Sequence, residues 1–181
     1  TWSATFGLAA RGGAKGGTLL GRARWAPSGS AVSGAGDVNG DGFDDLLIGA
    51  PAGAAAGNAK PNAGETYVVF GKATWSATLN LTDLNGTNGF TLLGIDPQDF
   101  SGSSVSGAGD VNGDGFADLI VGARGGAAFE NAKYNAGETY VIFGKATWSA
   151  TFGLETLNGA NGFTLFGADE QDRSGWSVSG A

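Results

Sequence analysis

The sequence predicts an all-β fold built from short antiparallel strands that recur along the chain. Three observations predict it: a long repeat period, short strand-like runs bounded by turn residues, and a glycine-rich composition without a triplet period. The tryptophans Trp2, Trp75 and Trp148 recur at an offset of 73 residues, each inside the string Thr-Trp-Ser-Ala-Thr. A fixed long period indicates a repeat architecture, so each period is expected to form one structural unit.

The period divides the 181 residues into two complete copies and part of a third. The copies span residues 1–73, 74–146 and 147–181, and we interpret them as one continuous repeat segment over 1–181. The stretch between Ala9 and Pro27 diverges from the later copies and is rich in Arg and Lys. It is expected to be a terminal, capping or partner-facing variant.

Each period contains four strand-like runs. In the later copy they span residues 103–108, 118–123, 138–143 and 162–167, and in the preceding copy 30–35, 45–50, 65–70 and 89–94. The first run is made of small alternating residues. The second is continuously apolar, which suits a strand buried on both faces. The third is rich in β-branched and aromatic residues, which favour strands.

Turn residues separate these runs, and the segments 53–64 and 126–137 are expected to be exposed loops. A short helical turn is expected around Leu154-Glu155-Thr156-Leu157. Four antiparallel strands repeated radially define a β-propeller, because one such sheet cannot cover both of its faces. The small residues of the first run suit an inner strand near the axis. The recurring tryptophans are expected to pack between the resulting blades.

Composition excludes several function classes. A net charge of −7 with scattered Lys and Arg does not provide the basic surface that nucleic acids require. No apolar run approaches the roughly 20 residues needed to span a bilayer. The chain has no Cys, so disulfides do not hold it, and no His, which removes the commonest general base. An enzyme is therefore not expected, and a scaffold within a secreted hydrolase is the least favoured alternative.

One nine-residue string occurs twice, at residues 37–45 and 110–118. Oxygen-bearing side chains fall at positions 1, 3, 5 and 9, with glycines at positions 4 and 6. Ca²⁺ takes six to eight oxygen ligands at roughly 2.3–2.6 Å, which this pattern can supply. A solvated Asn-Gly or Asp-Gly hairpin turn is the alternative. Three aspartates crowded into one loop would repel each other without a cation, and the string is doubled, so two Ca²⁺ sites are predicted.

The string is not an EF-hand loop. Its twelfth position holds Ile48 or Val121 rather than the bidentate Glu of that loop. The expected affinity therefore lies toward the weak, extracellular end of the calcium range.

Taken together, these motifs resemble the FG-GAP repeat of integrin alpha-chain propellers. The Phe-Gly pairs are residues 70–71 and 143–144, and Gly49-Ala50-Pro51 supplies the Gly-Ala-Pro. In the later copy Arg124 replaces the Pro after Gly122-Ala123. The resemblance covers essentially the whole chain and implies that the acidic string is a calcium loop between the first and second strands of a blade.

The resemblance also implies a ligand set for each of two Ca²⁺ ions. The first set comprises the side chains of Asp37, Asn39, Asp41 and Asp45 with the backbone carbonyl of Phe43. The second comprises the side chains of Asp110, Asn112, Asp114 and Asp118 with the carbonyl of Phe116. No catalytic residue is predicted.

The expected function is that of a calcium-stabilised extracellular or cell-surface module for adhesion, which binds a protein or glycan through its blade loops. The chain supplies two complete blades, an unpaired fourth strand near its N-terminus and an unpaired first strand near its C-terminus. Because propellers close with about four to eight blades, its expected partners are further blades or copies of itself. The alternative is a structural repeat protein that self-assembles into a ring or filament.

Overall fold

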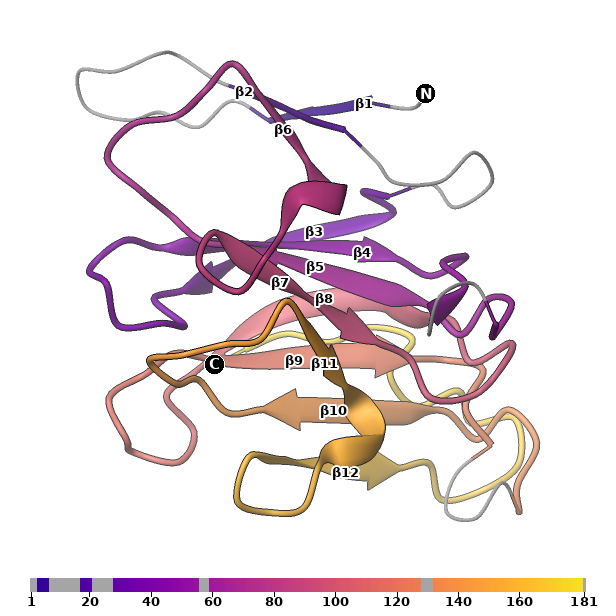
Figure 1. The fold of residues 1–181 in the computed structure, drawn as a ribbon. Coiled ribbons are helices and arrows are strands. Elements are labelled where there is room, and N and C mark those ends of the chain that lie inside the picture. The colour runs from indigo at the N-terminus through magenta and orange to yellow at the C-terminus, as the bar shows by residue number, and fades with distance from the viewer. Residues whose placement is uncertain (1–2, 7–16, 21–27, 56–58, 128–131, 181) are drawn as a thin grey trace.

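The computed structural model describes residues 3–6, 17–20, 28–55, 59–127 and 132–180. These residues form three β-sheets stacked one above the next, as the ribbon in Figure 1 shows. Two single-turn 3-10 helices accompany them, η1 (Leu81–Asp83) and η3 (Leu154–Thr156). The all-β prediction is thus confirmed, and η3 lies where a short helical turn was expected. None of the helices in the described residues is long and apolar enough to cross a membrane.

The two complete sheets follow the predicted four-strand plan. The first contains β3 (Ala31–Gly36), β4 (Asp45–Ala50), β5 (Glu65–Val69) and β7 (Gly89–Leu93). The second contains β8 (Ser101–Gly109), β9 (Asp118–Ala123), β10 (Glu138–Ile142) and β12 (Gly162–Phe166). Within each sheet the four strands pair antiparallel with their sequence neighbours. Both sheets are therefore β-propeller blades in their topology.

Each period also contributes a short strand that the sequence analysis did not predict. Strand β11 (Thr151–Gly153) follows the third strand of the second blade, yet it pairs parallel with β7 of the first. One period earlier, β6 (Thr78–Asn80) pairs parallel with β2 (Gly17–Leu20). This exchange connects neighbouring sheets through backbone hydrogen bonds. A run of three residues is too short for its alternation to be recognised.

The N-terminal sheet corrects one expectation. The fourth strand near the N-terminus was expected to lack partners, because its own blade is incomplete in the chain. Instead β2 pairs antiparallel with β1 (Ser3–Phe6) and parallel with β6. Most of the divergent stretch between Ala9 and Pro27 lies outside the described residues.

Small residues bring the inner strands of adjacent blades into close contact. An added Cβ at Gly107 would lie 3.1 Å from backbone atoms of Gly34 and Ala35, so β8 packs directly on β3. A Cβ at Gly49 would lie 2.1 Å from the carbonyl oxygen of Gly102. These contacts explain why small residues dominate the first strand of each period, as the propeller interpretation predicted.

The segment after β12 contacts the second blade as an inner strand would. A Cβ at Gly122 would lie 2.0 Å from the carbonyl oxygen of Gly175, which repeats the Gly49–Gly102 contact one period later. The Ser104 hydroxyl donates to that same carbonyl at 2.8 Å. The segment near the C-terminus that was predicted as a first strand packs against the blade before it, but no strand is assigned in the described residues after β12, so the strand prediction is wrong there.

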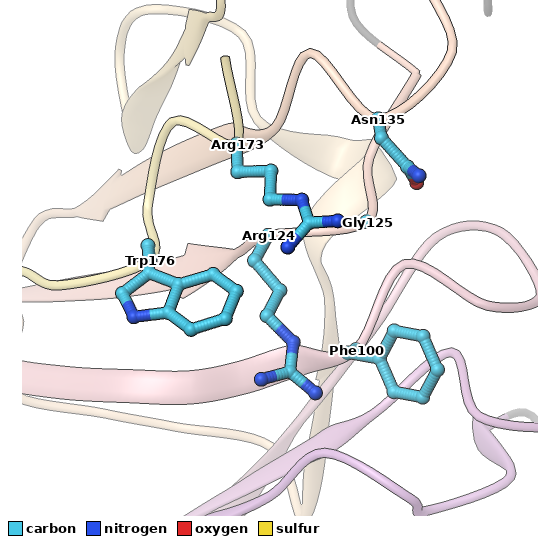
Figure 2. Close-up of a pocket in the computed structure, with 6 residues that line it drawn as sticks. All are labelled: Phe100, Arg124, Gly125, Asn135, Arg173 and Trp176. Atoms are coloured by element: carbon cyan, nitrogen blue, oxygen red, sulfur yellow. The ribbon is translucent and has the colours of Figure 1, made fainter. Parts of the chain in front are cut away.

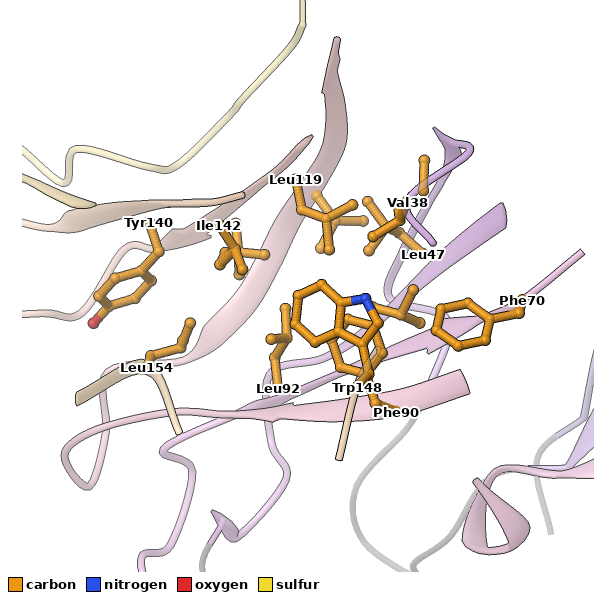
Figure 3. Close-up of a cluster of buried hydrophobic side chains, with 14 of the residues drawn as sticks. Val38, Leu47, Phe70, Phe90, Leu92, Leu119, Tyr140, Ile142, Trp148 and Leu154 are labelled. Carbon is orange, nitrogen blue, oxygen red and sulfur yellow. The ribbon is translucent and has the colours of Figure 1, made fainter. Parts of the chain in front are cut away.

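Trp148 joins the two blades in the main hydrophobic core. Its ring stacks on Phe90 of β7, with centroids 3.9 Å apart and 8° between the planes, and meets the edge of Phe152. Figure 3 shows this stack between side chains of both blades. Trp75, one period earlier, packs against a second core cluster around β4 and β5. The predicted packing role is confirmed for these two tryptophans, and Trp2 lies outside the described residues.

Candidate functional site

The two acidic strings form the loops between first and second strands. Residues 37–44 connect β3 to β4, and residues 110–117 connect β8 to β9. The loops start on half-buried or exposed residues and end on Asp45 and Asp118, which are buried at the first position of the next strand. Both strings therefore occupy the position that the propeller interpretation gave them.

The first aspartate of each loop organises the backbone around itself. In the first loop, one carboxylate oxygen of Asp37 accepts the N–H groups of Gly40 at 2.7 Å and Asp41 at 3.0 Å. The other oxygen accepts the N–H of Gly42 at 2.8 Å. Gly40 and Gly42 have φ angles of +74° and +87°, which a Cβ would disfavour. The glycines at positions 4 and 6 of the string thus let the loop wrap around its first carboxylate.

The side chains at positions 3 and 5 face each other. The side-chain carbonyl of Asn39 accepts the N–H of Asp41, and its amide donates to one Asp41 carboxylate oxygen at 2.9 Å. The other oxygen of Asp41 accepts the N–H of Phe43 at 2.9 Å. Asp41 is exposed, so its carboxylate can exchange these partners for another ligand.

The ninth-position aspartate is the buried anchor of the loop. The carboxylate of Asp45 is 1% exposed and accepts the N–H groups of Val38 at 2.9 Å and Gly71 at 2.7 Å. Burial raises the pKa of Asp45 to about 6, the two backbone hydrogen bonds oppose this shift, and the nearby Asp41 and Asp37 charges add to it. Asp45 therefore joins the loop to the Phe-Gly segment that follows β5.

The second loop repeats this arrangement almost bond for bond. Asp110 accepts the N–H groups of Gly113, Asp114 and Gly115 at 2.8, 3.1 and 2.9 Å. The buried Asp118 accepts the N–H groups of Val111 at 2.7 Å and Gly144 at 2.8 Å. The pairing between positions 3 and 5 recurs in Asn112 and Asp114. Two segments that are 73 residues apart thus form equivalent structures.

The two loops lie against each other. The N–H of Ala117 donates to the carbonyl of Asp37 at 3.0 Å, which links the second loop to the start of the first. The half-buried Phe116 ring lies over Gly40, where an added Cβ would be 2.7 Å from the ring. Phe43, its equivalent, is 43% exposed. Packing of one loop on the next was not predictable from either string alone.

The donor set of each loop fits a hard divalent cation. Three carboxylates, one amide oxygen and one carbonyl oxygen lie within nine residues, and hard cations such as Ca²⁺ prefer oxygen ligands. In the described residues no three His, Cys, Asp or Glu side chains are already gathered as a metal site. In this arrangement Asn39 and Asp41 are hydrogen-bonded to each other.

The structure also identifies buried acidic groups that the sequence analysis missed. Asp99 is 5% exposed, and its carboxylate accepts the N–H of Asp96 at 3.0 Å. Burial raises the pKa of Asp99 to about 7, the backbone hydrogen bond from Asp96 opposes this shift, and the charges of Glu138 and Asp96 add to it. Glu138 itself accepts the hydroxyl of Tyr140, so it is part of a buried network rather than an exposed acid. Glu138 is also the first residue of β10, as the predicted strand over 138–143 implied.

Comparison with known families identifies two repeats in the chain. The FG-GAP repeat matches residues 28–69 and 101–142, which cover the first three strands and the acidic loop of each complete blade. The chain therefore carries two FG-GAP repeats, as the resemblance predicted.

Similar proteins include integrin alpha chains. Integrin alpha pat-2 of Caenorhabditis elegans is 35% identical over 105 residues, which is 58% of this chain. Integrin alpha-2 of Mus musculus and integrin alpha-V of Gallus gallus are 33% and 37% identical over 97 residues, or 54% of this chain. In each case the match covers 8% of the relative's length. The likeness thus concerns the repeat blades and not the whole of those proteins.

Proposed function

We propose that this chain is a calcium-stabilised, non-enzymatic β-propeller segment that serves adhesion outside the cell. The doubled acidic loop carries the proposal, because two copies hold the same donor types in the same hydrogen-bonded arrangement. The FG-GAP repeats and the integrin alpha relatives support it. We further propose that residues 1–181 act as one repeat segment.

Each loop is proposed to hold one Ca²⁺ ion through the ligands named above. When bound, the ion supplies positive charge that offsets the repulsion between the clustered carboxylates. Asp37 keeps the backbone wrapped, while Asp45 ties the loop to Gly71 beyond β5. A filled loop would therefore brace three strands of its blade together. Dissociation constants of about 10⁻⁴–10⁻³ M, which are typical of extracellular calcium modules, suit this structural role.

Thermal unfolding with and without calcium tests this role. The chain should melt at a higher temperature in millimolar Ca²⁺ than in chelator, because an ion that binds only the folded state stabilises it. The double variant Asp41→Ala, Asp114→Ala should lose that difference. Asp44→Ala is the matched control: it copies the natural Ala117 of the second loop and should keep the response. Equal melting temperatures for the unmodified chain in both buffers would reject the proposal.

Assembly with further blades, or with copies of the chain, is the second candidate. The specific observation is that β2 and β7 each pair with a short parallel strand from the following period, whereas the described pairing of β12 is with β10. Leu165 on β12 is 49% exposed. An open outer strand is a template for pairing. Sedimentation of the chain at rising concentration tests for self-assembly. A mass that stays that of the monomer at all concentrations contradicts it.

A further inference from the structure

The loops that flank the strands of the second blade form a small basic pocket. Its volume is about 260 Å³, and its lining residues are Phe100, Arg124, Gly125, Asn135, Arg173 and Trp176. Figure 2 shows both arginine side chains reaching into the same space, with Trp176 and Phe100 on either side of Arg124. Among the described residues that line it there are two arginines and no carboxylate. In a chain with a net charge of −7, this is a local concentration of positive charge.

Aromatic rings orient the two guanidinium groups. The Arg124 guanidinium lies 5.3 Å from the Phe100 ring centroid and 5.0 Å from that of Trp176. The Arg173 guanidinium lies 5.5 Å from Trp176. These are cation–π distances. Among the described residues, neither guanidinium donates a hydrogen bond or pairs with a carboxylate, so their planar sets of N–H donors are available to a ligand.

The repeat shows that the fold does not require these side chains. One period earlier, Arg124 corresponds to Pro51, Arg173 to Phe100, and Trp176 to Ser103. Neighbouring motifs are kept between the copies, for example the six residues 62–67, which recur unchanged at 135–140. Three departures from the repeat therefore converge on one pocket, although their positions in the sequence are up to 52 residues apart.

We propose that this pocket binds the carboxylate of an Asp or Glu side chain presented by a protein partner. The inference rests on the proposed adhesive function and names its ligand class. A guanidinium fork matches a planar carboxylate through two parallel hydrogen bonds. The pocket is smaller than the roughly 300 Å³ at which small-molecule sites begin, so it suits one side chain. Arg and Trp are also the residue types enriched where protein interfaces gain most of their affinity.

Titration of the full 181-residue chain with N-acetyl-aspartate amide tests the proposal by NMR. At low salt, where exposed charges are least screened, we expect saturable shifts of the Trp176 indole N–H and of the Arg124 and Arg173 Nε–H signals. N-acetyl-asparagine amide, a neutral analogue of the same shape, should leave them unchanged. A heparin-type sulfated disaccharide forms the third arm, because sulfate also pairs with arginine.

The matched variants restore the residues of the preceding copy. Arg124→Pro and Arg173→Phe should each weaken aspartate binding by about tenfold, the effect of losing one charged hydrogen-bond partner. Their backbone spectra should otherwise match the parent spectrum. Three results overturn the proposal: no saturable shift with the aspartate probe, an equal shift with the asparagine probe, or binding of the sulfated disaccharide alone.

The carboxylate titration and the calcium test can give independent results. If the pocket binds no carboxylate but calcium still stabilises the chain, only the pocket assignment is wrong. If aspartate binds as expected but calcium does not stabilise the chain, the calcium-dependent function is wrong and the pocket stands.

Discussion

Truncation of Trp148 to Ala tests whether the two blades share one core. The side chain is 9% exposed, and it stacks on Phe90 of the other blade at 3.9 Å. Truncating a buried aromatic residue costs about 3–5 kcal/mol, of which the ring pair accounts for about 0.5–1.5 kcal/mol. For a chain of this size each kcal/mol lowers the melting temperature by roughly 2–4 °C. Trp148→Ala should therefore melt roughly 6–20 °C below the parent chain.

Circular dichroism during heating and urea unfolding measures this loss. Tyr134→Ala is the control, because that side chain is 68% exposed and its removal should change stability by about 0.5 kcal/mol or less. A double-mutant cycle of Trp148→Ala with Phe90→Leu should give a coupling energy of about 0.5–1.5 kcal/mol. If Trp148→Ala melts at the same temperature as the control variant, or if the coupling energy is zero, the blades do not share the core described above.

Two further predictions use equivalent positions as controls. Because the folded state favours protonated Asp99, whose pKa is about 7, stability should fall as pH rises from about 4 to 7. In urea unfolding at different pH values, Asp99→Asn should reduce this fall in the free energy of unfolding by at most about 4 kcal/mol. Asp172→Asn, at the exposed equivalent position, should leave the fall unchanged. The same pH dependence in both variants would contradict the raised pKa of Asp99. Gly40→Ala and Gly113→Ala change φ angles of +74° and +77°, but only the first added Cβ meets the Phe116 ring. Urea unfolding should show that Gly40→Ala is about 1–3 kcal/mol less stable than Gly113→Ala. Equal losses of stability in the two variants would disprove the contact between the loops.

The repeat made most of the fold predictable from sequence. A strand signal that is ambiguous once becomes clear when it recurs, and β4 and β9 begin and end where the apolar runs at 45–50 and 118–123 predicted. The places of both acidic loops followed from the same period. The short parallel strands β6 and β11 were missed, because their pairing depends on a neighbouring blade.

The candidate loops were predictable in their residues but only partly in their geometry. The string itself placed donors at positions 1, 3, 5 and 9. It did not show that Asp45 and Asp118 would be buried and bonded to Gly71 and Gly144, 26 residues away. The pocket of Arg124, Arg173 and Trp176 was likewise missed, although all three depart from the period. The sequence shows that these residues depart from the repeat, but only the structure shows that they lie together.

Counting the calcium ions bound per chain tests the central claim most directly. Equilibrium dialysis of the full chain at about 10 mM free Ca²⁺, roughly tenfold or more above the proposed dissociation constants, should give close to two ions per chain, since the acidic loop occurs twice. Asp41→Ala should retain one ion, and so should Asp114→Ala. A value near zero for the unmodified chain, or two ions retained in either variant, would contradict the account.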